Sequence, residues 1–258
     1  MKLRIASYNI SGSIYQNDDS TDYLDRKRSE DIDTRLLNNI VDNINQEKLD
    51  IICFQEIITT DHINYISRII ERTDLKHAEI FELSPCNTVE NANCGLATLS
   101  KYPIIDSIKQ LFTNPMLSKT TTNGNTYYTY DKGFLLTNIQ IDNKKLSILN
   151  NHNFPFRRFN STAEENVPVF VEFDNYVNNL KPNIIIGDFN SEHFLKMTPY
   201  TNKHYRKTIN DPTTDDGMHF DNILLPNQIN YTTKILSSSL SDHFMIIAEI
   251  DTSQFNTR

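Results

Sequence analysis

The sequence predicts a protein of mixed α and β structure, formed by one chain of 258 residues. The run Ile184-Ile185-Ile186 is typical of a strand that is buried on both faces. Apolar residues recur at helical spacing from Ile32 to Ile44, and again from Val169 to Leu180. Turn signals at Asn123-Gly124 and Asp142-Asn143 indicate antiparallel hairpins. No linker-like stretch divides the chain, so we expect a single domain over residues 1–258.

The first half of the chain alternates strands with two helices. We expect strands at residues 3–8 and 50–55, with a helix at 31–47 between them. A helix at 61–71 then precedes strands at 77–83, 95–100 and 104–112. The acidic stretch within residues 12–30 fits no calcium-binding loop, and its lysine and arginine neighbours favour a solvated surface.

The second half is richer in hairpins. A polar hairpin is expected within residues 113–131, where the tyrosines of the returning arm either contact a substrate or a membrane surface, or fold back onto the sheet. Further strands are expected at residues 133–141, 145–150, 184–186, 219–225 and 244–250, with a helix at 168–180 and a loop-rich stretch at 192–216. Gly187 is expected to end its strand with a turn.

The composition excludes a generally basic surface. The net charge is −8 and the pI is near 5.4, so a nucleic-acid substrate would need local basic groups or bound cations. No apolar run is long enough to span a membrane and none precedes the first strand, so we expect a cytoplasmic protein. Of the three cysteines, Cys53 fits a core strand, whereas Cys86 and Cys94 are either reduced or paired in an oxidising compartment.

Polar residues gather where the predicted strands end. Carboxylates in such number repel one another unless a cation neutralises them, and oxygen ligands favour Mg²⁺ or Mn²⁺. Neutral amides and imidazoles suit a phosphoryl group beside that cation. The residues at these strand ends are Asn9, Glu56, His152, Asp188, Asn190, Asp221, Asp242 and His243.

The segments that carry these residues resemble, in order, the motifs of the endonuclease/exonuclease/phosphatase superfamily. They are Tyr8-Asn9-Ile10, Phe54-Gln55-Glu56, the strand pair from Leu96 to Ile104, Asn151-His152, Gly187-Asp188-Phe189-Asn190, Phe220-Asp221-Asn222 and Ser241-Asp242-His243. The resemblance extends from end to end of the chain. It implies an α+β fold of the deoxyribonuclease I type, a four-layer αββα sandwich in which two mainly antiparallel sheets pack face to face. The site would lie at their shared edge.

The resemblance implies that Glu56 is the principal ligand of a divalent metal, Mg²⁺ with Mn²⁺ as an alternative. Asn9 and Asp242 would lie close to the metal, and Asn9 would also contact the substrate. Asp188 would orient and deprotonate the attacking water. The implied reaction is in-line hydrolysis of a phosphoester.

The remaining motif residues would act on the phosphoryl group. Asn190 and His152 would bind its non-bridging oxygens. His243, held in one tautomer by Asp221, would stabilise the charge that develops in the transition state.

Some positions depart from the superfamily's subgroups. Ser11, Ile57 and Asn222 stand where apurinic endonucleases carry other residue types, so the chain is unlike that branch. Arg157 and Arg158 follow His152 closely and either bind a second phosphate of the substrate or pair with the glutamates at 164 and 165.

We therefore expect a nuclease or phosphodiesterase that acts on DNA, RNA or a nucleotide. The alternatives are a lipid or sugar-phosphate phosphoesterase, similar to sphingomyelinases or inositol phosphatases, and a non-catalytic binding module on the same fold. The sequence leaves the substrate and the oligomeric state open.

Overall fold

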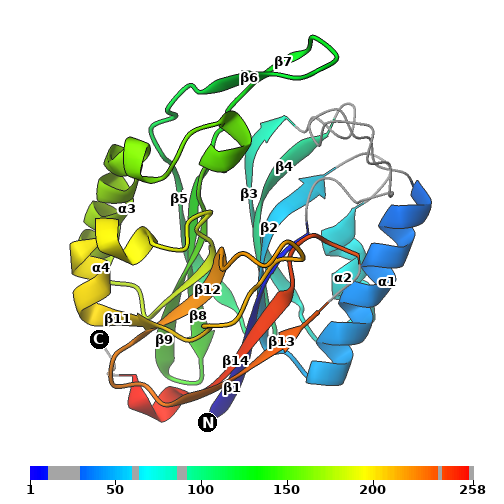
Figure 1. The fold of residues 1–258 in the computed structure, drawn as a ribbon. Helices are drawn as coiled ribbons and strands as arrows, with labels where there is room; N and C mark the ends of the chain where they lie inside the picture. Colours follow the sequence, from blue (N-terminus) through cyan, green and yellow to red (C-terminus); the bar gives the residue numbers. More distant parts are fainter. Residues whose placement is uncertain (11–29, 60–63, 86–91, 238–239, 256–258) are drawn as a thin grey trace.

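The computed structural model describes residues 1–10, 30–59, 64–85, 92–237 and 240–255. Two six-stranded sheets pack face to face, and helices cover the outer face of each sheet (Figure 1). The predicted four-layer αββα sandwich is therefore confirmed. The acidic stretch at residues 12–29, Ser11 and Cys86 lie outside the described residues. Within the described residues, no helix is long and apolar enough to cross a membrane.

The first sheet has the strand order β13-β14-β1-β2-β4-β3. Its β1 and β2 are parallel, and its other neighbours are antiparallel. The helices α1 (Glu30–Glu47) and α2 (Tyr65–Arg72) belong to this half of the molecule. The strands are β1 (Lys2–Asn9), β2 (Ile51–Thr59), β3 (His77–Pro85), β4 (Asn93–Ser100), β13 (Tyr231–Leu236) and β14 (Met245–Asp251).

The second sheet has the order β11-β12-β10-β9-β8-β5, in which β9 and β10 are parallel. It carries the helices α3 (Val167–Leu180) and α4 (Pro199–His204). A separate two-stranded hairpin, β6 (Ser118–Thr120) and β7 (Thr126–Tyr128), surrounds Asn123-Gly124 as the sequence predicted. The strands of the sheet are β5 (Ile104–Leu111), β8 (Gly133–Ile141), β9 (Lys144–His152), β10 (Ile184–Asp188), β11 (Tyr205–Lys207) and β12 (Asp221–Pro226).

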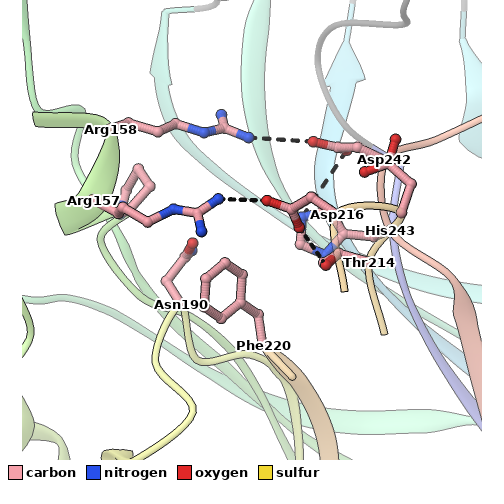
Figure 2. Close-up of a pocket in the computed structure, with 10 residues that line it drawn as sticks. Arg157, Arg158, Asn190, Thr214, Asp216, Phe220, Asp242 and His243 are labelled. Carbon is pink, nitrogen blue, oxygen red and sulfur yellow. Dashed lines mark hydrogen bonds and ion pairs between the residues drawn. The ribbon is translucent and has the colours of Figure 1, made fainter. Parts of the chain in front are cut away.

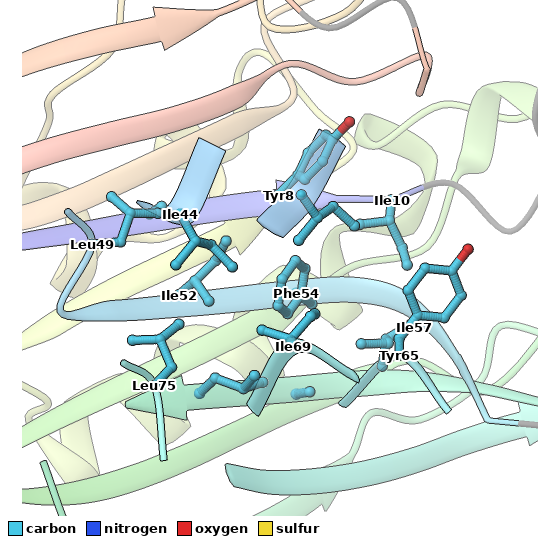
Figure 3. Close-up of a cluster of buried hydrophobic side chains, with 14 of the residues drawn as sticks. Tyr8, Ile10, Ile44, Leu49, Ile52, Phe54, Ile57, Tyr65, Ile69 and Leu75 are labelled. Carbon is cyan, nitrogen blue, oxygen red and sulfur yellow. The ribbon is translucent and has the colours of Figure 1, made fainter. Parts of the chain in front are cut away.

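The three largest apolar clusters of the described residues hold the four layers together. Side chains such as Ile44 of α1, Phe54 of β2 and Ile69 of α2 fill the space between helices and first sheet (Figure 3). Aliphatic side chains of both sheets form the central cluster between them. A phenylalanine-rich cluster lies between the second sheet and α3, where Phe189 stacks on Phe194 with ring centroids 3.9 Å apart. Burial of this apolar surface is the main favourable term in folding.

Several elements differ from the sequence predictions. Strand β2 does not end before Glu56 but continues to Thr59, because a β-bulge between Gln55 and Ile57 absorbs that residue. Strand β10 continues through Gly187, so the expected turn there is wrong. Any β-carbon on Gly187 would lie 2.0 Å from the carbonyl oxygen of Asn151, which explains the glycine by close approach of two strands.

Other elements were not predicted at all. The stretch at residues 192–216 contains α4 and β11, and β13 forms the outer edge of the first sheet. Helix α2 begins at Tyr65 in the described residues rather than at residue 61.

Candidate active site

Strand register in the second sheet aligns the predicted site residues in one row. Asp188 pairs with Asp221 on one side and with His152 on the other. His152 in turn pairs with Gly133 at the start of β8. Three neighbouring strands, β12, β10 and β9, therefore present polar residues at the same edge of the sheet, beside the start of β8.

The first sheet brings its own residues to this edge. Asn9, the last residue of β1, pairs with Gln55, which immediately precedes Glu56. The loop before β14 carries Asp242 and His243, and the Oγ of Ser241 in this loop donates a hydrogen bond to the carbonyl oxygen of Asn9 (2.8 Å). The two sheets thus meet at an edge lined with polar side chains from both.

Asp188 is buried at the centre of this edge. The backbone N–H of Asn190 donates to Oδ1 (2.8 Å), while the side-chain amides of Asn9 (3.0 Å) and Asn190 (3.1 Å) donate to Oδ2. Burial raises the pKa of Asp188 to about 7, although these donors and His243 oppose the rise. A carboxyl with this pKa can accept a proton near neutral pH.

His243 and Asp221 form a buried ion pair beside Asp188. Nδ1 of His243 lies 2.8 Å from Oδ2 of Asp221, which also accepts from the hydroxyl of Thr213 (2.8 Å). Nε2 of His243 lies 3.8 Å from Oδ2 of Asp188. Burial lowers the pKa of His243, but Asp221, Asp242 and Asp188 outweigh it and raise that pKa well above its usual value. The imidazole is therefore protonated at neutral pH.

Glu56 enters the site from the bulge of β2 in a left-handed conformation, with φ of 55°. Its Oε1 lies 3.6 Å from Nε2 of His152 and 4.0 Å from Nζ of Lys132. The β-bulge aims this carboxylate at the second sheet, which a regular strand would not do.

Lys132 is a site residue that the sequence reasoning missed. Its Nζ is buried and lies 3.1 Å and 3.3 Å from the two ring nitrogens of His152. Burial, with a contribution from Lys132, lowers the pKa of His152 well below its usual value, so this imidazole is neutral. Only the pairing of β8 with β9 could have identified Lys132, because Lys132 immediately precedes Gly133, which pairs with His152.

A divalent cation fits the donor set at this edge. Oδ1 of Asp242 is buried and has no hydrogen-bond partner among the described residues, and a bound cation would neutralise such an oxygen. The three predicted metal ligands belong to neighbouring segments of the first sheet: Asp242 to the loop before β14, Asn9 to β1 and Glu56 to β2. They are carboxylate and amide groups, which are ligands that Mg²⁺ and Mn²⁺ accept.

A second group of potential ligands exists among the described residues. Asp188, Asp221 and His243 place one ligand atom each within 4.8 Å of one another. Because a protonated imidazole has no lone pair for a metal, we interpret this group as a proton-handling cluster rather than as the metal site.

The two arginines line a cavity of about 220 Å³ that opens beside His243 (Figure 2). Nη2 of Arg158 lies 3.3 Å from Oδ2 of Asp242, and Arg157 forms an ion pair with Asp216 at 2.5 Å. The alternative pairing with the glutamates at 164 and 165 is not what the structure shows. Both arginines line the cavity together with Phe220, and their guanidinium groups point to Asp216 and Asp242.

Comparison with known proteins identifies the family. A sequence profile of the endonuclease/exonuclease/phosphatase family matches residues 6–243. The chain belongs to this family. Proteins of the endonuclease/exonuclease/phosphatase family are generally phosphoester hydrolases. A search of curated proteins found no match.

Solved structures share the fold at low sequence identity. A family protein from Leptotrichia buccalis is 14% identical, with a TM-score of 0.62 over 96% of this chain and 99% of that one. The human nocturnin catalytic domain with a bound sulfate anion is 17% identical, with a TM-score of 0.63 over 97% and 93%. A beta toxin mutant from Staphylococcus aureus with bound magnesium ions is 15% identical, with a TM-score of 0.66 over 96% and 99%.

Proposed function

We propose that this protein is a divalent-metal-dependent phosphodiesterase, and that its substrate is DNA, RNA or a nucleotide. The observation that carries the proposal is the environment of Asp188. A buried carboxyl with a pKa near 7 lies between neutral amide donors and a protonated imidazole. This arrangement suits a general base that works beside a developing negative charge.

In the proposed reaction, Asp188 accepts a proton from a water molecule as the water oxygen attacks phosphorus. The ester P–O bond on the opposite side breaks, and the leaving oxygen takes a proton from solvent. The protonated His243, held by Asp221, stabilises negative charge on the phosphoryl oxygens.

The neutral His152 provides a ring N–H for a phosphoryl oxygen, and Lys132 adds positive charge beside it. Asn190 keeps Asp188 in place, since both its backbone N–H and its amide donate to that carboxylate.

Glu56, Asn9 and Asp242 would hold the metal, Mg²⁺ or Mn²⁺, which would neutralise charge on the phosphate when bound. The beta toxin structure with bound magnesium ions has the same fold and supports a cation of this type. The cavity beside His243 supports a nucleic-acid or nucleotide substrate, because Arg157 and Arg158 would bind a further phosphate if they exchanged their present partners, Asp216 and Asp242, for it.

The experiment compares the wild-type protein with Asp188→Ala on plasmid DNA, single-stranded RNA and a phosphocholine lipid, each with Mg²⁺ and with EDTA. We expect Mg²⁺-dependent cleavage of one nucleic acid that the variant loses. Cleavage in EDTA, or full activity of the variant, would contradict the proposal.

A lipid phosphoesterase is the second candidate. Met116, just before the β6–β7 hairpin, and Tyr128, the last residue of β7, are exposed by 69% and 57%, and both side chains would be available to contact a lipid surface. Cleavage of the phosphocholine lipid alone would favour this candidate.

A further inference from the structure

Two buried amides interrupt the apolar interface between the sheets. Gln55 of β2 and Asn150 of β9 are both completely buried. The Nε2 of Gln55 donates to Oδ1 of Asn150 at 2.7 Å, and the Oε1 of Gln55 accepts from the hydroxyl of Ser7 at 3.2 Å. The Nδ2 of Asn150 donates to the carbonyl oxygens of Phe54 (3.0 Å) and Ala97 (3.1 Å).

We call this pair of amides the Gln55–Asn150 clasp. Its hydrogen bonds join β9 of the second sheet to β2 and β4 of the first. Around it, the central cluster is mainly aliphatic, and the hydrophobic attraction that holds such side chains together is non-directional. Hydrogen bonds are directional, so the clasp fixes at one point how one sheet lies along the other.

The clasp lies directly below the catalytic edge. Gln55 is the residue before Glu56, at the start of the β-bulge that aims Glu56 into the site. Asn150 lies two residues before His152 on the same strand, so both side chains point to the same face of β9. Gln55 is therefore adjacent in sequence to Glu56 of the first sheet, and Asn150 is two residues from His152 of the second sheet.

Burying these amides is not needed for stability alone. Replacing a buried polar pair by apolar side chains of similar shape is often neutral for stability, whereas a polar pair can specify one arrangement. Because this pair is fully hydrogen-bonded and lies beneath the candidate active site, we interpret it as a group that specifies one arrangement of the two sheets. Groups outside the ligand set that fix the backbone of a ligand's strand can orient the residues that hold a metal.

We propose that Gln55 and Asn150 are positioning residues that set the location of Glu56 relative to His152 and Asp188. The proposal rests on the function proposed above, since it assumes that Glu56 holds the metal. Loss of the clasp would let the β2 bulge shift against the second sheet, although neither amide touches the substrate.

The test uses Gln55→Met, which keeps the shape of the side chain, and Asn150→Leu. Asn150→Ser is the alternative if leucine prevents folding. The matched control is Thr98→Val, which removes another buried polar contact, between the hydroxyl of Thr98 and the Sγ of Cys53 (3.7 Å). Circular dichroism and thermal unfolding establish that each variant is folded at the assay temperature.

The readouts are Mn²⁺ affinity by titration calorimetry, and kcat and KM on the substrate that the wild type cleaves. We expect the clasp variants to bind Mn²⁺ about 10- to 100-fold more weakly and to lose kcat to a similar extent, with little change in KM. The Thr98→Val control should keep wild-type values for all three quantities.

Clasp variants that lose thermal stability but match the control in Mn²⁺ affinity and kcat would show a structural role alone and overturn the proposal. A wild type that binds Mn²⁺ without cleaving any phosphodiester would refute the proposed function, while the affinities would still test the clasp. A wild type that binds no Mn²⁺ would overturn both.

Discussion

Replacing Asp188 with asparagine removes a buried negative charge but keeps the size of the side chain. In the wild type this carboxyl is 1% exposed, and burial raises its pKa from 3.8 to about 7. Asparagine cannot accept the proton of an attacking water. We expect the variant to lose phosphodiesterase activity by about 10²- to 10⁴-fold and to gain stability relative to the wild type as the pH rises.

The size of the gain follows from the pKa. The folded state holds this proton more tightly than the unfolded chain, so its contribution to stability is complete below pH 3.8 and is lost as the pH rises through about 7. The rise in the pKa corresponds to about 4 kcal/mol, of which about 3 kcal/mol is lost between pH 5 and pH 8. The asparagine variant does not incur this loss.

The assay is denaturant unfolding of both proteins in EDTA at pH 5 and pH 8, followed by circular dichroism. Titrating groups remote from the site are common to both proteins and cancel in the difference. His243 does not, because Asp188 raises its pKa, so Asp221→Asn and the double variant Asp188→Asn/Asp221→Asn are measured alongside to separate the part that His243 contributes. The free energy of unfolding of the variant relative to the wild type should increase by about 3 kcal/mol from pH 5 to pH 8, or by about 6 to 12 °C in Tm. A difference that is the same at both pH values would refute the assignment of a raised pKa to Asp188.

Three further predictions follow from contacts in and below the site. With Mg²⁺ present, kcat/KM should rise with pH to about 7 as Asp188 ionises, and fall at higher pH as His243 loses its proton. The variant Asp221→Asn should move this fall to lower pH, because Asp221 raises the pKa of His243. A fall at the same pH as in the wild type would contradict the pairing of His243 with Asp221. Lys132→Met removes a cation 4.0 Å from Glu56, so Mn²⁺ held by Glu56 should bind several-fold more tightly. KM should rise, because the variant lacks the positive charge beside the phosphoryl group. An unchanged Mn²⁺ affinity by calorimetry would argue against this placement of Lys132. Gly187→Ala should lower the free energy of unfolding by about 3 kcal/mol or more, because the new β-carbon would lie 2.0 Å from the carbonyl oxygen of Asn151. The control Gly217→Ala, at positive φ with no atom nearby, should lower it by about 1 kcal/mol. Equal urea midpoints for the two variants would refute the strain argument.

The sequence predicted the position of a site residue well where that position depends on the end of a strand. Asp188 and His152 follow apolar β-runs, and strand register then brings them side by side. The same holds for Asn9 at the end of β1. Local patterns are sufficient here because the parallel neighbours β9 and β10, and likewise β1 and β2, end at the same edge of their sheet.

The sequence reasoning failed where a position depends on contacts between distant segments. Lys132 has no distinctive local pattern, and only pairing of β8 with β9 brings it to His152. The β-bulge at Glu56 depends on how β2 pairs with β4, and the ion pair of Arg157 with Asp216 joins residues that are far apart in the chain. Short elements such as β11 gain their stability from pairing rather than from their own sequence.

The central claim is that the first sheet holds the metal and the second sheet activates the water. The most direct measurement is the rate of hydrolysis of bis-p-nitrophenyl phosphate during a Mg²⁺ titration of the wild type, Glu56→Gln and Asp188→Asn. Glu56→Gln should raise the Mg²⁺ concentration for half-maximal rate about tenfold or more, while Asp188→Asn should lower the maximal rate about 10²-fold or more at an unchanged Mg²⁺ requirement. Wild-type turnover that persists in EDTA, or an Asp188→Asn variant that retains the full maximal rate, would contradict the claim.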